Sequence, residues 1–352
     1  MSHISRRTAL CLVGGSLAAK FIIPRDAGSA QAAAVVPRRR LGKTDMTVSV
    51  VGFGGLTIGR AGSNQELVTR LLNRALDNGL NLLDTAECYG FPEQNHSESL
   101  IGSAVGHRRK EYSVCTKVGH ENGAFAQRHE DWSAASIHRT IDRSLRRLKT
   151  DVLDLVYLHG TPWRILRDGD CIPALQHAHE AGKIRYLGYS GSGERLRYAI
   201  NAGMFQVIQV SLNIFDQEAI DEILPLAREK GLGVVTKRPM GNAVWRYEER
   251  PDWWYYHEYW ELMHALGYPF LKADALNDSG PEGAGGMALR FVTSTPGVHC
   301  AIVGTRTPGR WSQNNANIAA GSLPIESYRA IRKKWQEVVA AAGKDEDGTP
   351  PC

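Results

Sequence analysis

Leu83-Asp84-Thr85-Ala86-Glu87-Cys88-Tyr89-Gly90 joins an apolar run to a polar turn and carries both a carboxylate and a phenol. Three further stretches have the same form: Cys115-Thr116-Lys117, Val156-Tyr157-Leu158-His159 and Gly188-Tyr189-Ser190. Each lies at or just past the C-terminal end of an apolar run typical of a strand, and a helical pattern follows each run. In a closed barrel of parallel strands, those strand ends converge on one face, where the chemistry of such barrels takes place.

The same alternation continues along the chain. Strands are predicted at residues 50–54, 80–84, 112–117, 153–159, 184–190, 206–210, 233–237 and 298–304. Helices are predicted near 64–78, 96–105, 134–148, 170–181, 194–201, 217–230, 308–320 and 327–342. Eight strand–helix units predict an α/β fold of the (β/α)8 TIM-barrel type. A doubly wound sheet is the alternative, and it is disfavoured because no G-x-G-x-x-G turn follows the first strand.

Segments outside this alternation complete the predicted organisation. Residues 40–44 and 46–48 are predicted to form a small β-hairpin around a Gly turn, ahead of the barrel. The barrel domain is expected to span residues 36–342. After the seventh strand, residues 238–286 form a long insertion that is rich in tryptophan and tyrosine. These aromatic rings either stack on a substrate or pack the insertion onto the barrel or a partner subunit. Residues 343–352 are predicted to be a flexible tail.

The N-terminus has the pattern of an export signal. Ser5-Arg6-Arg7-Thr8 is a twin-arginine sequence, an apolar segment follows it, and Ala30-Gln31-Ala32 offers small residues for cleavage. The pattern predicts a twin-arginine signal peptide at residues 1–32, use of the corresponding export machinery and a periplasmic location. An uncleaved N-terminal tail is the alternative. Because this route exports folded proteins, a cofactor could be acquired before export.

Composition limits the choice of partners. The formal net charge is only +5 in 352 residues, which gives no argument for nucleic-acid binding. Histidines are numerous, yet they show neither H-x-H spacing at a strand end nor an accompanying carboxylate cluster. A metal-dependent hydrolase is therefore disfavoured, and no metal site is predicted. The expected partner is a small-molecule substrate, and the oligomeric state stays open.

Four predicted strand-end residues suit proton transfer to a carbonyl oxygen. Tyr89 is the candidate proton donor, and a nearby ammonium group of Lys117 would favour the phenolate and lower the pKa of the phenol. Asp84 would hold Lys117 charged and in place, and His159 would donate to the carbonyl oxygen or shape the site. Each residue alone has an ordinary structural explanation, such as a loop cap or turn packing. Their occurrence on three consecutive strands favours the catalytic interpretation.

The chain resembles the aldo-keto reductases, and this resemblance extends from about residue 39 to about residue 341. The family's Asp-Thr-Ala-x-x-Tyr-Gly and Ser-Glu-x-x-x-Gly sequences match residues 84–90 and 97–102. Its strand-end Thr-Lys and Leu-His match Thr116-Lys117 and Leu158-His159. Its Gly-Lys-Ile-Arg-x-x-Gly-x-Ser matches residues 182–190, and its adenosine-phosphate loop matches 301–308. The resemblance implies Tyr89 as general acid and base, activated by Lys117 and Asp84, with His159 near the carbonyl.

The resemblance also implies an extended nicotinamide dinucleotide across the strand ends. Gly54 and Gly55 would approach it closely, and Ser190 and Gln209 would bind its carboxamide. The adenosine end would be held by Gly304, Thr305, Arg306, Arg310, Gln313 and Asn314. Arg306 and Arg310 suit a 2′-phosphate through forked hydrogen bonds, so NADP(H) is favoured over NAD(H).

Two positions depart from the family pattern. The chain has Ser190-Gly191 where Ser-Asn is usual, and it has Lys237 where an aromatic residue usually stacks on the nicotinamide. Lys237 either faces the nicotinamide or turns toward the cofactor pyrophosphate, aided by Arg238. The expected function is interconversion of a carbonyl, in an aldehyde, ketone or sugar, and an alcohol. The alternative is an exported NADP(H)-binding redox sensor or partner-binding barrel with little or no turnover.

Overall fold

A closed barrel of eight parallel strands forms the centre of the chain, in the order β3-β4-β5-β8-β9-β10-β11-β12. The computed structural model describes residues 36–60, 63–90, 96–121, 129–271 and 280–342. The predicted signal peptide at 1–32 and the predicted tail at 343–352 lie outside these residues. None of the helices among the described residues is long and apolar enough to cross a membrane.

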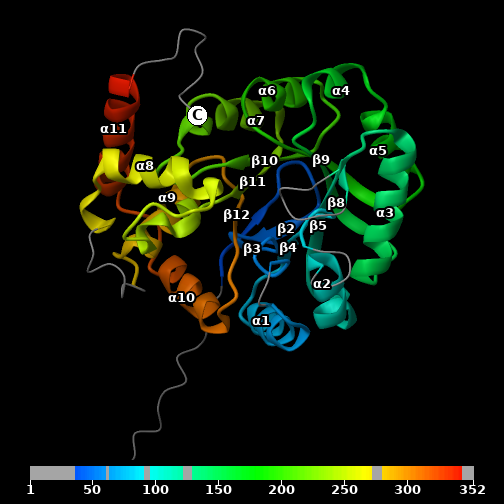
Figure 1. The fold of residues 1–352 in the computed structure, drawn as a ribbon, viewed down its shortest axis with the longest axis horizontal. Coiled ribbons are helices and arrows are strands. Elements are labelled where there is room, and N and C mark those ends of the chain that lie inside the picture. Colours follow the sequence, from blue (N-terminus) through cyan, green and yellow to red (C-terminus); the bar gives the residue numbers. More distant parts are fainter. Residues whose placement is uncertain (1–35, 61–62, 91–95, 122–128, 272–279, 343–352) are drawn as a thin grey trace, which may run out of the picture. The chain divides into compact units, whose positions relative to one another are not determined.

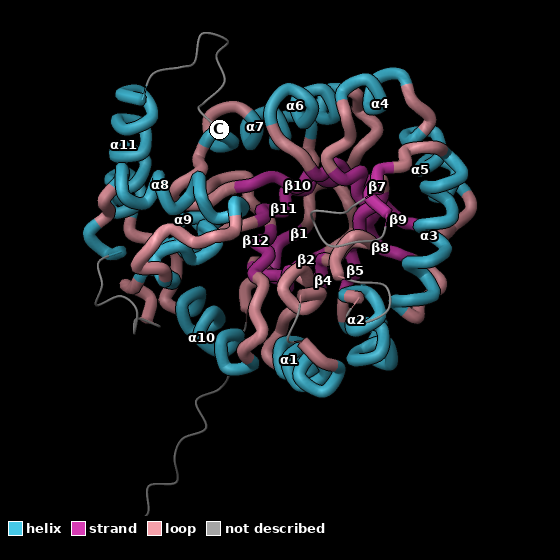
Figure 2. Tube along the Cα trace, viewed as in Figure 1, coloured by secondary structure: helices cyan, strands magenta, loops and turns pink. Residues whose placement is uncertain are grey.

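The barrel strands follow the alternation predicted from the sequence. They are β3 Val51–Gly54, β4 Leu82–Asp84, β5 Ser113–Val118, β8 Leu153–His159, β9 Ile184–Ser190, β10 Val207–Ser211, β11 Gly233–Lys237 and β12 Cys300–Val303. Figure 2 shows these strands surrounded by helices. The prediction of a (β/α)8 barrel is confirmed, and strand starts differ by at most two residues.

The helices that cover the barrel also lie close to their predicted ranges. They are α1 Gln65–Asp77, α2 Ser97–Val105, α3 Ala134–Leu148, α5 Cys171–Glu180, α6 Gly193–Asn201, α7 Ile223–Lys230, α10 Pro308–Ala319 and α11 Ile325–Ala342 (Figure 1). The predicted helix at 217–230 is divided into the 3-10 turn η2 Glu218–Ile220 and α7. Side chains fix some of these ends: Asn64 accepts a hydrogen bond from Leu67 N at the start of α1, as an N-cap residue does.

The insertion after β11 contains more regular structure than the sequence indicates. It includes η3 Gly241–Arg246, η4 Trp254–Tyr256, α8 His257–Leu266 and η5 Pro269–Leu271. The seventh barrel helix is α9 Ala284–Ser294, which begins inside the stretch predicted to be irregular. A Cβ atom on Gly286 would lie 2.3 Å from the carbonyl oxygen of Gly280. A glycine is therefore present here because the backbone packs closely, and not because the segment is a loop. Short elements α4 Trp163–Asp168, η1 Gly106–Glu111 and the pair β6 His120–Glu121 and β7 His129–Glu130 were also missed.

The N-terminal hairpin closes the barrel at the end opposite the strand C-termini. Its strands are β1 Arg38–Arg40 and β2 Thr47–Ser49, and Leu41, Met46 and Val48 pack into the barrel interior. The predicted hairpin is confirmed, with its turn placed at residues 41–46.

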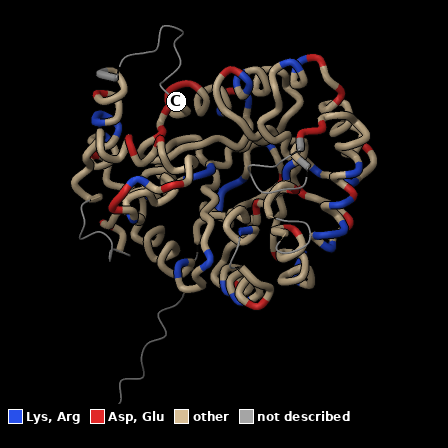
Figure 3. Tube along the Cα trace, viewed as in Figure 1, with Lys and Arg blue, Asp and Glu red and all other residues tan. Residues whose placement is uncertain are grey.

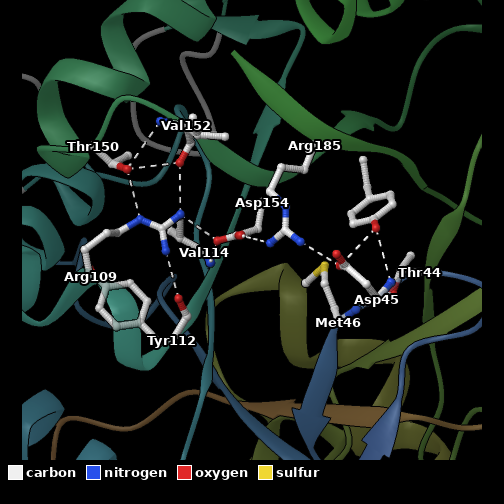
Figure 4. A network of polar contacts seen from close by, with 11 residues as sticks. Thr44, Asp45, Met46, Arg109, Tyr112, Val114, Thr150, Val152, Asp154 and Arg185 are labelled. Carbon is white, nitrogen blue, oxygen red and sulfur yellow. Dashed lines mark hydrogen bonds and ion pairs between the residues drawn. The ribbon is translucent and has the colours of Figure 1, made fainter. Parts of the chain in front are cut away.

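A network of ion pairs fastens this hairpin to the strand starts. Asp154 accepts from Arg109 Nη2 at 2.6 Å and from Arg185 Nη1 at 2.7 Å, and Arg185 also donates to Asp45 at 2.6 Å (Figure 4). A surface depression of about 590 Å³ lies here, lined by residues that include Arg109, Asp154 and Arg185. This end of the barrel is built for stability, because its charged groups are paired with one another.

Charges elsewhere are mixed. Figure 3 shows Lys and Arg interspersed with Asp and Glu over the outer helices, rather than gathered on one face. This distribution agrees with the expectation from the small net charge.

Candidate active site

Strand register places the predicted site residues at one end of the barrel. Side chains alternate between the two faces of a strand, so residues two apart share a face. Leu82 and Val235 belong to the packed barrel interior, which puts Asp84 and Lys237 on the inward face of their strands. The inward residues at the C-terminal strand ends are Asp84, Lys117, His159, Ser190, Gln209 and Lys237.

Asp84 and Lys117 form a buried ion pair at the centre of this end. Lys117 Nζ donates to Asp84 Oδ1 at 2.5 Å and to the carbonyl oxygen of Thr85 at 2.7 Å. Each of the two charged side chains is only 1% exposed. Burial raises the pKa of Asp84 above its usual value, and the charge and hydrogen bond of Lys117 oppose that rise. The pair brings the predicted carboxylate and amine together.

Tyr89 lies beside this pair. It precedes Gly90, whose φ of +105° favours glycine, and Lys117 Nζ lies 4.8 Å from the centroid of the Tyr89 ring. Burial first, and then the negative charge of Asp84, raise the pKa of Tyr89 well above its ordinary value. The sequence predicted the opposite direction. The difference arises because Asp84 neutralises Lys117 while desolvation disfavours the phenolate. Tyr89 is therefore held as a phenol, which is the proton-donating form.

His159 also lies beside Tyr89. The two ring centroids are 6.0 Å apart and the rings are nearly perpendicular. Nδ1 of His159 lies 3.6 Å from Sγ of Cys88, and its ring lies 4.8 Å from that of His120. The four predicted catalytic residues are thus brought together, with Cys88 and His120 as neighbours that spacing along the sequence did not single out.

Ser190 and Gln209, the two residues predicted to bind a carboxamide, form a chain of hydrogen bonds that ends at Asp84. Ser190 Oγ donates to Gln209 Oε1 at 3.0 Å, and Gln209 Nε2 donates to Asp84 Oδ2 at 2.7 Å. One amide proton and one lone pair of Gln209 remain available beyond these bonds. Gln209 therefore connects the predicted carboxamide site to the catalytic ion pair.

Gly191, the first departure from the family pattern, has a local packing reason. A Cβ atom at this position would lie 2.6 Å from Cε1 of Tyr189, whose side chain is fully buried. An asparagine at position 191 would require the Tyr189 ring to move. Gly191 therefore replaces the usual asparagine where the Tyr189 ring, packed in the core outside the barrel strands, occupies the space next to it.

Lys237, the second departure, faces inward. Its strand position shares the face of Val235, and its ammonium group interacts electrostatically with Lys117 and Asp84. Burial first, and then the positive charges of Arg238 and Lys117, lower the pKa of Lys237 to about 7. Of the two orientations that the sequence left open, the inward one is found.

The backbone of Arg238, which follows Lys237, has a φ of +57° and so leaves the strand conformation for the left-handed region. Its Nε donates to the hydroxyl group of Tyr255 at 2.8 Å, and its guanidinium lies 4.5 Å from the centroid of that ring. Tyr259 donates to Asp216 at 3.0 Å close by, and burial raises the pKa of Asp216 to about 7.

Tyr255, which accepts this hydrogen bond from Arg238, is half-buried. Most other aromatic residues of the insertion pack onto the barrel: Trp245 and Tyr259 are buried around Phe215. Packing onto the barrel therefore explains most of the aromatic residues in the insertion. The sequence alone did not distinguish Tyr255 from these other rings.

The predicted adenosine-binding residues gather where β12 meets α10, beside the catalytic group. A Cβ atom on Gly54 would lie 3.4 Å from Gly304 N, and one on Gly55 would lie 2.6 Å from Ser97 Oγ. Among the described residues, buried Gln313 Oε1 accepts no hydrogen bond and buried Asn314 Nδ2 donates none. Buried polar groups normally have partners, so these two atoms fit contacts to a bound ligand.

Arginines surround the same place. Arg306 is exposed and Arg310 is half-buried, with Thr305 between β12 and α10. Arg246, at the end of η3, was not predicted, and the positive charge of Arg310 contributes to lowering its pKa. Because these arginine side chains are all positively charged and lie in the same region, they favour an anionic ligand there.

Comparisons with known proteins agree with this arrangement. The profile of the Aldo/keto reductase family matches residues 50–336. The chain belongs to the aldo/keto reductase family. It is 30% identical over 318 residues to the uncharacterized oxidoreductase YqkF of Bacillus subtilis, covering 87% of this chain and 98% of the relative. It is also 30% identical over 230 residues to the L-galactose dehydrogenase of Arabidopsis thaliana, covering 61% and 69% of the two chains.

Solved structures of the same family are similar throughout the barrel. The holo form of an aldo-keto reductase from Bacillus halodurans superposes with a TM-score of 0.71 at 27% identity, covering 85% of this chain and 96% of that one. The glycerol dehydrogenase of Gluconobacter oxydans superposes with a TM-score of 0.70 at 26% identity, covering 88% and 97%. The aldo/keto reductase barrel and the oxidoreductase class are therefore established for this chain.

Proposed function

We propose that this aldo/keto reductase is an NADP(H)-dependent oxidoreductase that interconverts a carbonyl group and an alcohol by hydride transfer. The observation that carries the proposal is that Tyr89 lies close to both the Asp84–Lys117 ion pair and His159. Bound NADPH would supply the hydride to the carbonyl carbon. The protein's own residues then have to orient the carbonyl and deliver a proton to its oxygen.

Tyr89 is suited to deliver that proton. Burial raises the pKa of Tyr89 and keeps it as a phenol, so its hydroxyl group holds the proton that the developing alkoxide needs. His159 would hold the carbonyl oxygen from the other side. Lys117 would stabilise the phenolate left after transfer, because its ammonium group lies against the ring.

The preference for NADP(H) over NAD(H) is part of the proposal. Arg306, Arg310 and Arg246 place positive charge around the start of α10, where helix N–H groups also favour an anion. A 2′-phosphate is the group that distinguishes NADP(H) and would take forked hydrogen bonds from arginine. We expect Arg310→Gln to weaken NADPH binding by about tenfold or more, since a hydrogen bond to a charged group contributes ~1.5–3 kcal/mol, while NADH binding changes little.

For the substrate we propose a small carbonyl compound or sugar. The relatives named L-galactose dehydrogenase and glycerol dehydrogenase support polyhydroxylated substrates.

The test combines cofactor titration with turnover in the full chain. NADPH and NADH binding would be followed by fluorescence for the unmodified protein, Tyr89→Phe and Tyr157→Phe, and turnover would be measured on a panel of aldehydes, ketones and sugars. We expect Tyr89→Phe to bind NADPH normally and to lose about 10²–10⁴-fold in kcat. Tyr157→Phe is the matched control, because its buried hydroxyl group has no described hydrogen-bond partner and its loss should leave kcat unchanged.

Two results would contradict the proposal. Equal turnover of Tyr89→Phe and the unmodified protein would remove Tyr89 from the chemistry. Tight NADPH binding without turnover on any substrate would favour a redox sensor.

We further propose that residues 1–32 direct export through the twin-arginine machinery to the periplasm. The support is the sequence Ser5-Arg6-Arg7-Thr8 with its following apolar segment and Ala30-Gln31-Ala32. Replacing Arg6 and Arg7 by lysine should retain the protein in the cytoplasmic fraction, and unchanged fractionation would contradict the proposal.

A further inference from the structure

We propose that Cys88, His120 and His159 form a binding site for Zn²⁺ beside the catalytic tyrosine. One ligand atom from each residue lies within 4.8 Å of the other two. The residues come from three elements: Cys88 from the turn after β4, His120 from the start of β6, and His159 from the end of β8. A thiolate and two imidazoles are ligands typical of Zn²⁺ and not of Mg²⁺ or Ca²⁺.

The distances suit a tetrahedral ion. Zn–S bonds of about 2.3 Å and Zn–N bonds of about 2.0–2.1 Å place sulfur and nitrogen roughly 3.6 Å apart at a tetrahedral angle. Cys88 Sγ and His159 Nδ1 are already 3.6 Å apart. The third ligand atom lies within 4.8 Å of the other two and has to move inward by roughly 1.5 Å or less, which a rotation of the His120 side chain supplies.

The surroundings of His120 support a ligand role. Its Nε2 lies 3.4 Å from Glu130 Oε1, while its ring packs edge-on against Trp132 with centroids 5.5 Å apart. Histidines that bind a metal usually direct their other ring nitrogen to a carboxylate or carbonyl group, which fixes the ring. Glu130 is placed for that function, and Nδ1 of His120 is then the ligand atom. The charges of the Cys88 thiolate and Glu130 together balance those of Zn²⁺.

Binding has defined chemical consequences. Zn²⁺ replaces the proton of the Cys88 thiol, so one proton is released to the solvent for each ion bound. Three protein ligands leave a fourth position for water, as in open zinc sites. Because the ion takes Nδ1 of His159, the ring proton is left on Nε2, where it would donate to a carbonyl substrate. This last consequence rests on the proposed function, whereas metal binding itself does not.

The test is a direct titration of the metal-free full chain, with Co²⁺ as a spectroscopic probe and Zn²⁺ by calorimetry. We expect one ion per chain, a thiolate-to-Co²⁺ charge-transfer band in the near ultraviolet and the visible bands of tetrahedral Co²⁺. Cys88→Ser should lose the charge-transfer band, and His120→Gln should weaken Zn²⁺ binding at least tenfold. Glu130→Gln should weaken it by about 10–100-fold, as the loss of an outer carboxylate typically does.

Cys171→Ser is the matched control, because Cys171 is also a buried cysteine but lies in α5 and donates to the carbonyl oxygen of Ile165 in α4. It should bind both ions as the unmodified protein does. Absence of the charge-transfer band in the unmodified protein, or equal Zn²⁺ affinity in His120→Gln and the unmodified protein, would overturn the proposal. NADPH titration of the same preparations reports separately on the proposed function, so the two failures are distinguishable.

Discussion

Gln209 donates a hydrogen bond of 2.7 Å to Asp84 Oδ2, opposite the oxygen that binds Lys117. Both carboxylate oxygens of Asp84 are therefore engaged, one by a charged donor and one by a neutral amide. Burial alone would push the proton onto Asp84, and these two donors act against it. The strand-end amide of Gln209 thus assists Lys117 in lowering the pKa of Asp84 against the effect of burial.

We expect Gln209→Leu to move the acidic limb of the kcat/KM profile to higher pH. The hydrogen bond to a charged group is worth about 1.5–3 kcal/mol, which corresponds to a rise of roughly 1–2 units in the pKa of Asp84. Because the ion pair needs Asp84 ionised, activity at low pH should fall more than activity at high pH. Ser190→Ala is the comparison, since it removes only the bond to Gln209 Oε1 and should shift the limb less. An unmoved acidic limb in Gln209→Leu would contradict the expected coupling.

The Asp84–Lys117 pair should show strong coupling in a double-mutant cycle. Asp84→Asn or Lys117→Met alone leaves one partner buried without its counter-charge, which costs about 3–5 kcal/mol in the free energy of unfolding. The double variant removes both charges and should recover most of that loss. Urea denaturation of the four proteins measures the cycle. Single losses that simply add in the double variant would show that the pair is not coupled.

The order of the strands and the placement of the catalytic residues could be predicted from the sequence. Apolar runs end in polar residues at one barrel face, and the two-residue alternation fixes that Asp84, Lys117 and His159 point inward. These predictions succeed because they depend on local periodicity alone.

Other features depend on contacts that the sequence does not encode locally. The direction of the Tyr89 pKa shift is set by desolvation and by Asp84, which outweigh the nearby ammonium group. Cys88, His120 and His159 meet only because three different strand ends converge. Helix α9 begins with glycines of low helix propensity, and tertiary packing at Gly286 overrides that preference.

Asp154 should matter for stability and not for catalysis. Its Oδ2 accepts from Arg109 and from Val114 N at 2.8 Å, its Oδ1 accepts from Arg185, and the carboxylate is 5% exposed (Figure 4). Asp154→Ala should lower the free energy of unfolding by about 3–5 kcal/mol, as expected when one partner of a buried ion pair is removed. Its kcat should be unchanged, because the network lies at the strand starts.

Asp168→Ala is the control for this prediction. Asp168 pairs with Arg167 at 2.6 Å on the surface, where ion pairs contribute about 0–1 kcal/mol. Chemical denaturation of both variants compares the two sites. Equal stabilities of Asp154→Ala and Asp168→Ala would show that the network at the base of the barrel does not stabilise the fold.

Lys237 should make the discrimination between oxidised and reduced cofactor depend on pH. Burial and the charges of Arg238 and Lys117 lower its pKa to about 7, so the amine is positive below that pH and neutral above it. The oxidised nicotinamide ring is also positive and is repelled only by the charged amine. The ratio of the Kd for NADP⁺ to the Kd for NADPH should therefore fall as pH rises through 7. We expect a change of about tenfold, which is ~1.4 kcal/mol and within the ~4 kcal/mol of two unit charges 4 Å apart near a protein surface.

Taking the ratio isolates the nicotinamide end, because both cofactors carry the same phosphates and those ionisations cancel. Lys237→Met should give a ratio that is low and independent of pH, since no charge remains at this position. Lys237→Arg should keep the ratio high across the range, because a guanidinium stays protonated. Fluorescence titrations between pH 6 and pH 9 measure all three proteins. A pH-dependent ratio that persists in Lys237→Met would assign the effect to another group.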